Sequence, residues 1–276
     1  MSYKTILVHV DNGKRCPARL AVAIQMARRS DAHLVGLHAM TALRLPAYAA
    51  AEAGAVLIEA QQRAFAEQSL RAKNTFDKAI SAAGLSKVEW RATDADAVDA
   101  VTLHARYADL VVLSQPHASD NAGVEEDFAE RVVLACGRPA LVVPYADSYK
   151  SIGERVLVAW NATREATRAL TDAIPMLRDA KEVKVIAINP DDADHGAVPA
   201  ADISLFLARH GVRAEAVTDY GDDIDVGNEL LSRAADYNSD LIVMGAYGHS
   251  RMRELIMGGA TRTIITSMTV PVLLSH

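Results

Sequence analysis

The chain has 276 residues, half of them apolar and 23% charged, with a net charge of -6. This length exceeds what one average domain needs and suits two domains that each bury an apolar core. The negative charge argues against nucleic acid as the main partner, because a phosphate backbone is bound by basic surface.

The start of the chain runs straight into an apolar strand, without the long apolar region of a signal peptide. No apolar stretch reaches the ~18 residues of a membrane helix. Cys16 and Cys136 lie far apart and form no C-x-x-C motif, which is typical of packing cysteines in a reducing compartment. We therefore expect a cytoplasmic protein with no membrane partner.

Short apolar runs in the first half predict strands with helices between them. The runs are continuous rather than alternating, as expected for a parallel sheet covered by helices on both faces. A helix is predicted over 16–30. An Ala-, Gln- and Glu-rich region covers about 49–84, and within it the segment around 61–78 predicts a solvated helix that covers the domain rather than a partner motif. The predicted strands are 4–10, 33–39, 87–92, 109–114 and 140–143.

The second half repeats the first. The run ILVHVD at 6–11 reappears as VLVAWN at 156–161, and DLVVL at 109–113 reappears as DLIVM at 240–244. A helix is predicted over 165–178, as after the first strand of the first half. The predicted strands are 155–160, 183–188, 212–218, 240–245 and 271–274.

This alternation of strands and helices implies right-handed crossovers and a doubly wound sheet in each half. We therefore expect an α/β protein with two Rossmann-like domains in tandem, each with a five-stranded, mostly parallel sheet. The domains are predicted over residues 1–146 and 150–276, with a linker over about 145–153.

A glycine-rich loop follows the fourth strand of the second half. Gly245 and Gly248 are separated by two residues, and nine more separate Gly248 from Gly258. Ligands of such sheets bind beyond the carboxyl ends of the strands, and glycines let backbone N–H groups approach phosphate oxygens. Gly259, Ala260 and Thr261 then begin the last helix, whose N-terminus favours an anion. The chain has neither a G-x-x-x-x-G-K-[ST] loop nor a G-x-G-x-x-G loop after a strand.

The G-x2-G-x9-G pattern, the helix start after it and the closing run TVPVLL at 269–274 resemble the universal stress protein family. Two copies resemble its tandem members, and the resemblance covers essentially the whole chain. It implies adenine-nucleotide binding, with ATP as the ligand and Mg²⁺ left open. The site residues that it implies are Asn161, Ile188, Gly245, Gly248, His249, Gly258, Gly259, Ala260 and Thr261.

Two positions of the second half depart from the family pattern. Gly259 stands where family members usually have Ser or Thr, so a hydroxyl contact is lost, and Thr261 is the substitute we expect. Asn161 stands where many members have an aspartate.

The first half departs further from this pattern. Its loop reads SQPH at 114–117, and the acidic run 125–127 falls where the third glycine is expected. Carboxylates there repel a phosphate. We therefore interpret the first domain, which keeps Asp11, as structural.

Each half ends in a short strand after a proline, at the edge of its sheet. An exposed apolar edge strand is an aggregation hazard, and the family resemblance implies dimerisation through it. We expect strands 140–143 and 272–274 to pair within the chain as a pseudo-dimer, and a further homodimer stays open.

Several other features have ordinary interpretations. The run DDADH at 191–195 predicts a solvated loop rather than a metal site, because it lacks defined ligand spacing. Asp222, Asp223 and Asp225 are typical of a helix N-terminus. His249 fits a phosphate contact and an exposed loop histidine equally well.

Three functions remain in competition. The first is a regulatory stress protein that binds ATP in its second domain and changes its contacts with protein partners. The second is an interaction scaffold without a nucleotide. The third is a slow ATP hydrolase, against which the chain shows no constellation of acid, base and nucleophile.

Overall fold

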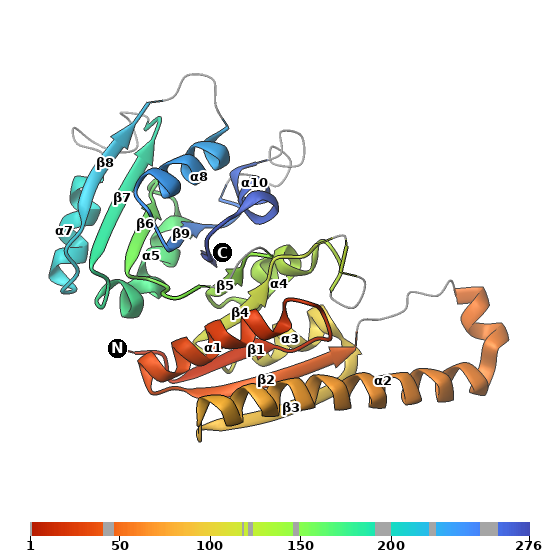
Figure 1. Ribbon diagram of the computed structural model, residues 1–276. Coiled ribbons are helices and arrows are strands. Elements are labelled where there is room, and N and C mark those ends of the chain that lie inside the picture. The colour runs from red at the N-terminus through yellow and green to blue at the C-terminus, as the bar shows by residue number, and fades with distance from the viewer. Residues whose placement is uncertain are drawn as a thin grey trace.

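The computed structural model describes residues 2–40, 47–117, 119–120, 124–145, 149–190, 200–220, 225–248 and 259–276, with the backbone alone for 47–58. Within these residues, two α/β halves lie side by side and share one continuous sheet (Figure 1).

The first half is a five-stranded parallel sheet with the predicted doubly wound order. Its strands lie in the order β3-β2-β1-β4-β5. The strands are β1 (Thr5–His9), β2 (His33–Met40), β3 (Val88–Asp96), β4 (Leu110–Ser114) and β5 (Ala140–Val143). The helices between them are α1 (Cys16–Ser30), α2 (Ala47–Ala83), α3 (Ala97–Ala105) and α4 (Phe128–Cys136).

The second half has the same order, β10-β9-β6-β7-β8, again with parallel neighbours. Its strands are β6 (Arg155–Ala159), β7 (Glu182–Ile188), β8 (Glu215–Asp219), β9 (Leu241–Gly245) and β10 (Val272–Ser275). Its helices are α5 (Arg164–Leu177), α7 (Ala201–Arg209), α8 (Val226–Asp236) and α10 (Ala260–Ser267).

One predicted strand starts too early. Residue 212 was expected to begin the third strand of the second half, but β8 begins at Glu215. The Val212 N–H donates to the Leu207 carbonyl at 3.0 Å, after Gly211 turns the chain at a φ of +79°. Val212 therefore closes the end of α7 rather than starting the strand.

The two edge strands pair as predicted. β5 and β10 are antiparallel neighbours, with Leu141 opposite Leu273 and Val142 opposite Val272. All four of these side chains are fully buried. The pairing removes both apolar edges from solvent and makes one ten-stranded sheet from two parallel ones.

Helices from both halves cover each face of this sheet in matching positions. Buried residues of α1, α2, α5 and α7 form one apolar core with one face. Buried residues of α3, α4, α8 and α10 form a second core with the opposite face. This burial on both faces explains why the strands are continuous apolar runs.

The long helix α2 covers the first domain, as predicted. Its C-terminal half packs on β2, with Phe76 buried against Gly36. A Cβ on Gly36 would lie 2.6 Å from the Phe76 ring, so this strand position requires glycine. The N-terminal end of α2 extends beyond the edge of the sheet (Figure 1).

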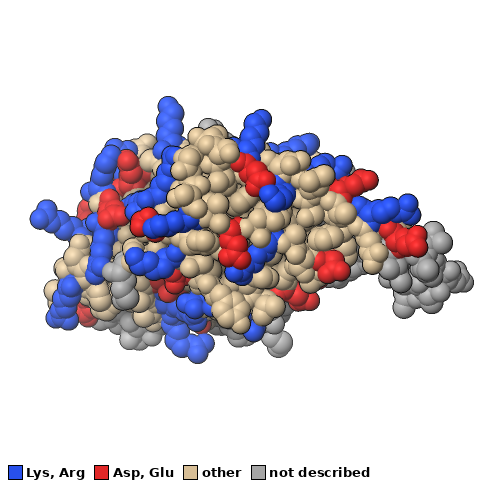
Figure 2. All heavy atoms as spheres, turned by 90° about the horizontal axis from the view of Figure 1, so that it is seen from below, with Lys and Arg blue, Asp and Glu red and all other residues tan. Residues whose placement is uncertain are grey.

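The described surface carries mixed charge. Figure 2 shows Lys and Arg side chains interspersed with Asp and Glu over the face seen from below. Among the described residues, no helix is both long and apolar enough to cross a bilayer.

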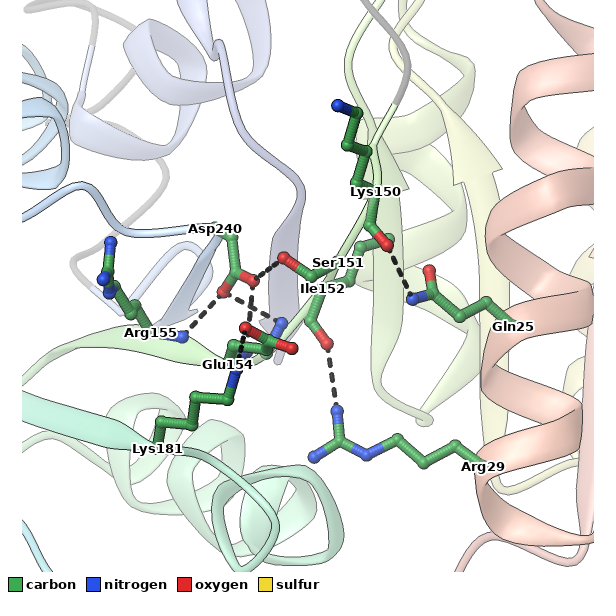
Figure 3. Close-up of polar contacts among 10 residues, drawn as sticks. Gln25, Arg29, Lys150, Ser151, Ile152, Glu154, Arg155, Lys181 and Asp240 are labelled. Carbon is green, nitrogen blue, oxygen red and sulfur yellow. Dashed lines mark hydrogen bonds and ion pairs between the residues drawn. The ribbon is translucent and has the colours of Figure 1, made fainter.

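Asp240, just before β9, fixes the end of the linker (Figure 3). Its carboxylate accepts hydrogen bonds from the backbone N–H groups of Gly153, Glu154 and Arg155 at 2.9–3.1 Å, and from the Ser151 hydroxyl at 2.9 Å. The matching residue of the repeat, Asp109, does the same for the start of β1. The repeated aspartate therefore holds the first strand of each half.

Arg29 on α1 joins the first domain to the linker and to the second domain. Its guanidinium donates to the carbonyls of Ile152 and Met176, both at 3.0 Å, and pairs with Asp179 at 3.0 Å. The contact with Ile152 is drawn in Figure 3. Hydrogen bonds of this kind, added to the shared sheet, hold the two halves in one arrangement.

Candidate functional site

The second domain has a crevice at the carboxyl ends of β6, β7 and β9. It encloses about 620 Å³, counting space open to solvent. β6 and β9 are the first and fourth strands of this half, so the crevice lies at the switch point of the sheet, where ligands of such folds bind. α8 and α10 complete its walls.

Six of the nine predicted site residues line this crevice. They are Asn161, Ile188, Gly245, Gly248, Ala260 and Thr261. Gly259 is the N-cap of α10, adjacent to that lining. His249 and Gly258 lie outside the described residues, as do residues 191–195, Asp222 and Asp223.

Much of the remaining lining is apolar and was missed in the sequence. Trp160 follows the end of β6, and Val226 and Leu230 come from α8. Trp160 directly precedes Asn161, so its place at the end of a first strand was a signal that it faces the crevice. The α8 residues gave no such signal, because their approach depends on how α8 packs on the sheet. Asp225, as predicted, is the N-cap of α8, and it accepts a hydrogen bond from the Asn228 N–H at 3.1 Å.

Asn161 organises the N-terminus of α5 at one side of the crevice. Its Oδ1 accepts a hydrogen bond from the Thr163 hydroxyl at 2.8 Å. Thr163 is in turn the N-cap of α5 and accepts from the Ala166 N–H at 3.3 Å. The amide of Asn161 therefore has a local structural role beside any contact with a ligand.

Gly245 is required by packing against α5, and Gly248 lies close to side chains of the same region. A Cβ on Gly245 would lie 2.5 Å from the backbone nitrogen of Ala166. A Cβ on Gly248 would lie 3.0 Å from a carboxylate oxygen of Glu165 and 3.4 Å from the hydroxyl of Thr163. The close approach of the loop to the helix thus accounts for Gly245 without a ligand, whereas the neighbours of Gly248 are side-chain ends that a small shift would move away.

The start of α10 faces the same loop. Its N-cap, Gly259, makes no side-chain capping bond, so the first N–H groups of the helix have no side-chain acceptor there. Thr261 is 3% exposed, and its hydroxyl oxygen accepts a hydrogen bond from the Tyr247 N–H at 3.2 Å. Thr261 therefore ties α10 to the loop, and the helix N-terminus is the electropositive element of the described crevice.

The described lining contains no Lys or Arg. Glu165 brings a buried carboxylate beside Gly248, paired at 3.2 Å with Arg164, whose side chain is 95% exposed. An exposed partner screens a buried charge poorly. Backbone N–H groups at the start of α10 are therefore the positive part of the described lining.

The corresponding crevice of the first domain is smaller and filled by its own side chains. It encloses about 280 Å³, again counting open solvent. The Arg19 guanidinium, 1% exposed, pairs with Asp11 at 2.9 Å and donates to the Ser114 hydroxyl at 2.5 Å. The His9 ring is buried beside Asp11 at 3.7 Å, with Phe128 packed on its other side. This buried cluster occupies the space that corresponds to the open crevice of the second domain.

The repeat explains the difference between the two crevices. At the positions that match His9, Arg19 and Ser114, the second domain has Ala159, Ala169 and Gly245. Three short residues leave a crevice open where three longer polar ones close it.

Burial and charge set the protonation of this cluster. Burial alone would raise the pKa of the Asp11 carboxyl, but the Arg19 guanidinium outweighs that effect and holds the pKa below its usual value. Burial lowers the pKa of His9 to about 3, so its ring is neutral at pH 7. Among the described residues neither ring nitrogen of His9 has a hydrogen-bond partner.

These features define a class: a tandem, doubly wound α/β protein with its sheets joined edge to edge and an open crevice at the switch point of the second. The sequence matches the Universal stress protein family over residues 2–144 and 153–276. The chain belongs to the universal stress protein family, as a member with two copies of the domain.

A relative in another organism agrees with this assignment. A universal stress protein of Synechocystis is 26% identical over 150 residues, which are 52% of this chain and 49% of that protein. The match thus spans about half the length of that relative.

Two solved structures share the fold. The universal stress protein of Archaeoglobus fulgidus has a TM-score of 0.68 at 18% identity, covering 98% of this chain and 95% of its own. A functionally unknown protein of Pseudomonas aeruginosa has a TM-score of 0.63 at 14% identity, covering 99% of this chain and 92% of its own.

Proposed function

We propose that this universal stress protein binds one adenine nucleotide, ATP, in the crevice of its second domain, and that it acts as a regulatory protein rather than an enzyme. The observation that carries the proposal is the contrast between the two crevices. One is open at the switch point, and a buried Arg19–Asp11 pair fills the other. The domain over 150–276 is therefore the proposed nucleotide domain, and the domain over 1–146 the structural one.

The chemistry of the open crevice suits a nucleotide. Trp160, Ile188 and Leu230 offer apolar and aromatic surface to a flat base. The N-cap of α10, Gly259, makes no side-chain capping bond, so the first N–H groups of this helix are available to a phosphate as far as the described residues go. Mg²⁺ bound with the nucleotide would offset the negative charge of Glu165 beside the loop.

A scaffold without a nucleotide is the second candidate. The observation that favours it is the packing at Gly245, where α5 requires glycine whether or not a phosphate binds. A binding measurement separates the two candidates.

The variant Val226→Trp tests the proposed site. Val226 lines the crevice and is 43% exposed, so a larger side chain fills the mouth of the crevice without entering the core. We expect binding of ATP in the presence of Mg²⁺, measured by calorimetry, to weaken roughly tenfold or more. The thermal midpoint should stay close to that of the unaltered protein, as for most surface substitutions.

Leu205→Trp is the matched control for this variant. Leu205 is 53% exposed on α7 and does not line the crevice. Its affinity for ATP should equal that of the unaltered protein. Equal affinity in Val226→Trp as well would show that ATP binds elsewhere, and no ATP binding to the unaltered protein would favour the scaffold.

A further inference from the structure

Gln115 reaches from the altered loop of the first domain into the second domain. Its side-chain Nε2 donates to the carbonyls of Ile265 at 2.8 Å and Thr266 at 2.9 Å. Its Oε1 accepts from the Tyr145 N–H at 2.7 Å, and its own N–H donates to the Val143 carbonyl at 2.8 Å. The residue is 9% exposed, so these bonds are largely shielded from water.

The two carbonyls belong to the last turn of α10, where a helix leaves its carbonyls without partners of its own. The opposite end of α10 carries Ala260 and Thr261, which line the open crevice. α10 has eight residues and is therefore about 12 Å long. A helix this short moves as one rod, so an anchor at its C-terminus also sets the direction of its N-terminus.

The second domain has no equivalent of this side-chain contact. Gln115 in the first domain matches Ala246 in the second, and an alanine cannot return the hydrogen bonds to the first domain. The loop of the first domain has thus lost its glycines and gained a side chain that serves the other domain.

We propose that Gln115 is a positioning residue for the ligand site of the second domain: it holds α10 so that the N–H groups at the start of this helix face the crevice. The identity of the ligand rests on the proposed function. The ordering of α10 by Gln115 does not depend on any ligand. The altered loop of the first domain would then contribute to the ligand site of the second domain.

The variant Gln115→Met tests this proposal. Methionine has a similar length and leaves the two α10 carbonyls without their donor. We expect affinity for ATP with Mg²⁺ to fall roughly fivefold to twentyfold, a coupling of ordinary size between sites. Without nucleotide, amide hydrogen exchange over 260–268 should become faster, because local opening becomes easier.

Tyr3→Phe is the matched control. The Tyr3 hydroxyl donates across the same domain boundary, to the Asp172 carbonyl of α5 at 2.8 Å, and does not touch α10. We expect its affinity for ATP and its exchange over 260–268 to match those of the unaltered protein. Equal loss of affinity in both variants would overturn the proposal, because it would reflect general loosening of the boundary.

ATP affinity and hydrogen exchange over 260–268 test the positioning role of Gln115 separately from the proposed nucleotide binding. If the unaltered protein binds no ATP, the proposed function fails, and the exchange measurement still decides whether Gln115 orders α10. Unchanged exchange over 260–268 in Gln115→Met overturns the positioning role. Faster exchange there together with unchanged affinity overturns its link to the ligand site.

Discussion

Asp11→Ala should destabilise the protein by about 3–5 kcal/mol, because it leaves the Arg19 guanidinium buried without its counter-charge. Arg19 is 1% exposed, and its remaining bond to the Ser114 hydroxyl does not neutralise the charge. Denaturant unfolding followed by circular dichroism measures the loss.

Asn161→Ala is the control that the repeat supplies, because Asn161 occupies the matching position in the second domain. Asn161 is exposed and unpaired with any described charge, so its replacement should cost about 1 kcal/mol or less. Equal losses in the two variants would contradict a buried ion pair as the filling of the first crevice.

Acid should destabilise the protein through His9. Burial lowers the pKa of His9 in the folded chain to about 3, below the ordinary 6.5 of the unfolded chain. The unfolded chain therefore binds a proton that the folded chain does not. The contribution of His9 is unchanged above pH 6.5, and stability falls by about 1.4 kcal/mol per pH unit below it, down to about pH 3.

His9→Leu removes this group while keeping a similar volume. Between pH 7.5 and 4.5 the unaltered protein should lose about 2.5 kcal/mol more of its unfolding free energy than His9→Leu does. Parallel curves for the unaltered protein and His9→Leu would contradict a buried neutral His9.

The strand order and the pairing of β5 with β10 were predictable, because both follow from patterns along the chain. Continuous apolar runs identify parallel strands, and Ala140–Val143 and Val272–Ser275 are apolar edges that need cover. A comparison of the two halves of the repeat could also have predicted the filled crevice. Arg19 matches Ala169, so the first half has a long cationic side chain where the second half has only a methyl group.

Other features depend on distances that the sequence does not contain. Gly245 was predicted as a phosphate contact, while the structure adds the approach of the α5 backbone to 2.5 Å from a Cβ at this position. Gln115 marked a degenerate loop, and its bonds to α10 depend on the rotation of one half against the other. Val226 enters the crevice because of the packing of α8.

We propose one nucleotide site per chain, in the second domain. Calorimetric titration of the full chain with ATP in the presence of Mg²⁺ tests it most directly. We expect one ATP bound per chain, with affinity weakened roughly tenfold or more in Val226→Trp. Two ATP bound per chain, or one that binds Val226→Trp with unchanged affinity, would contradict it.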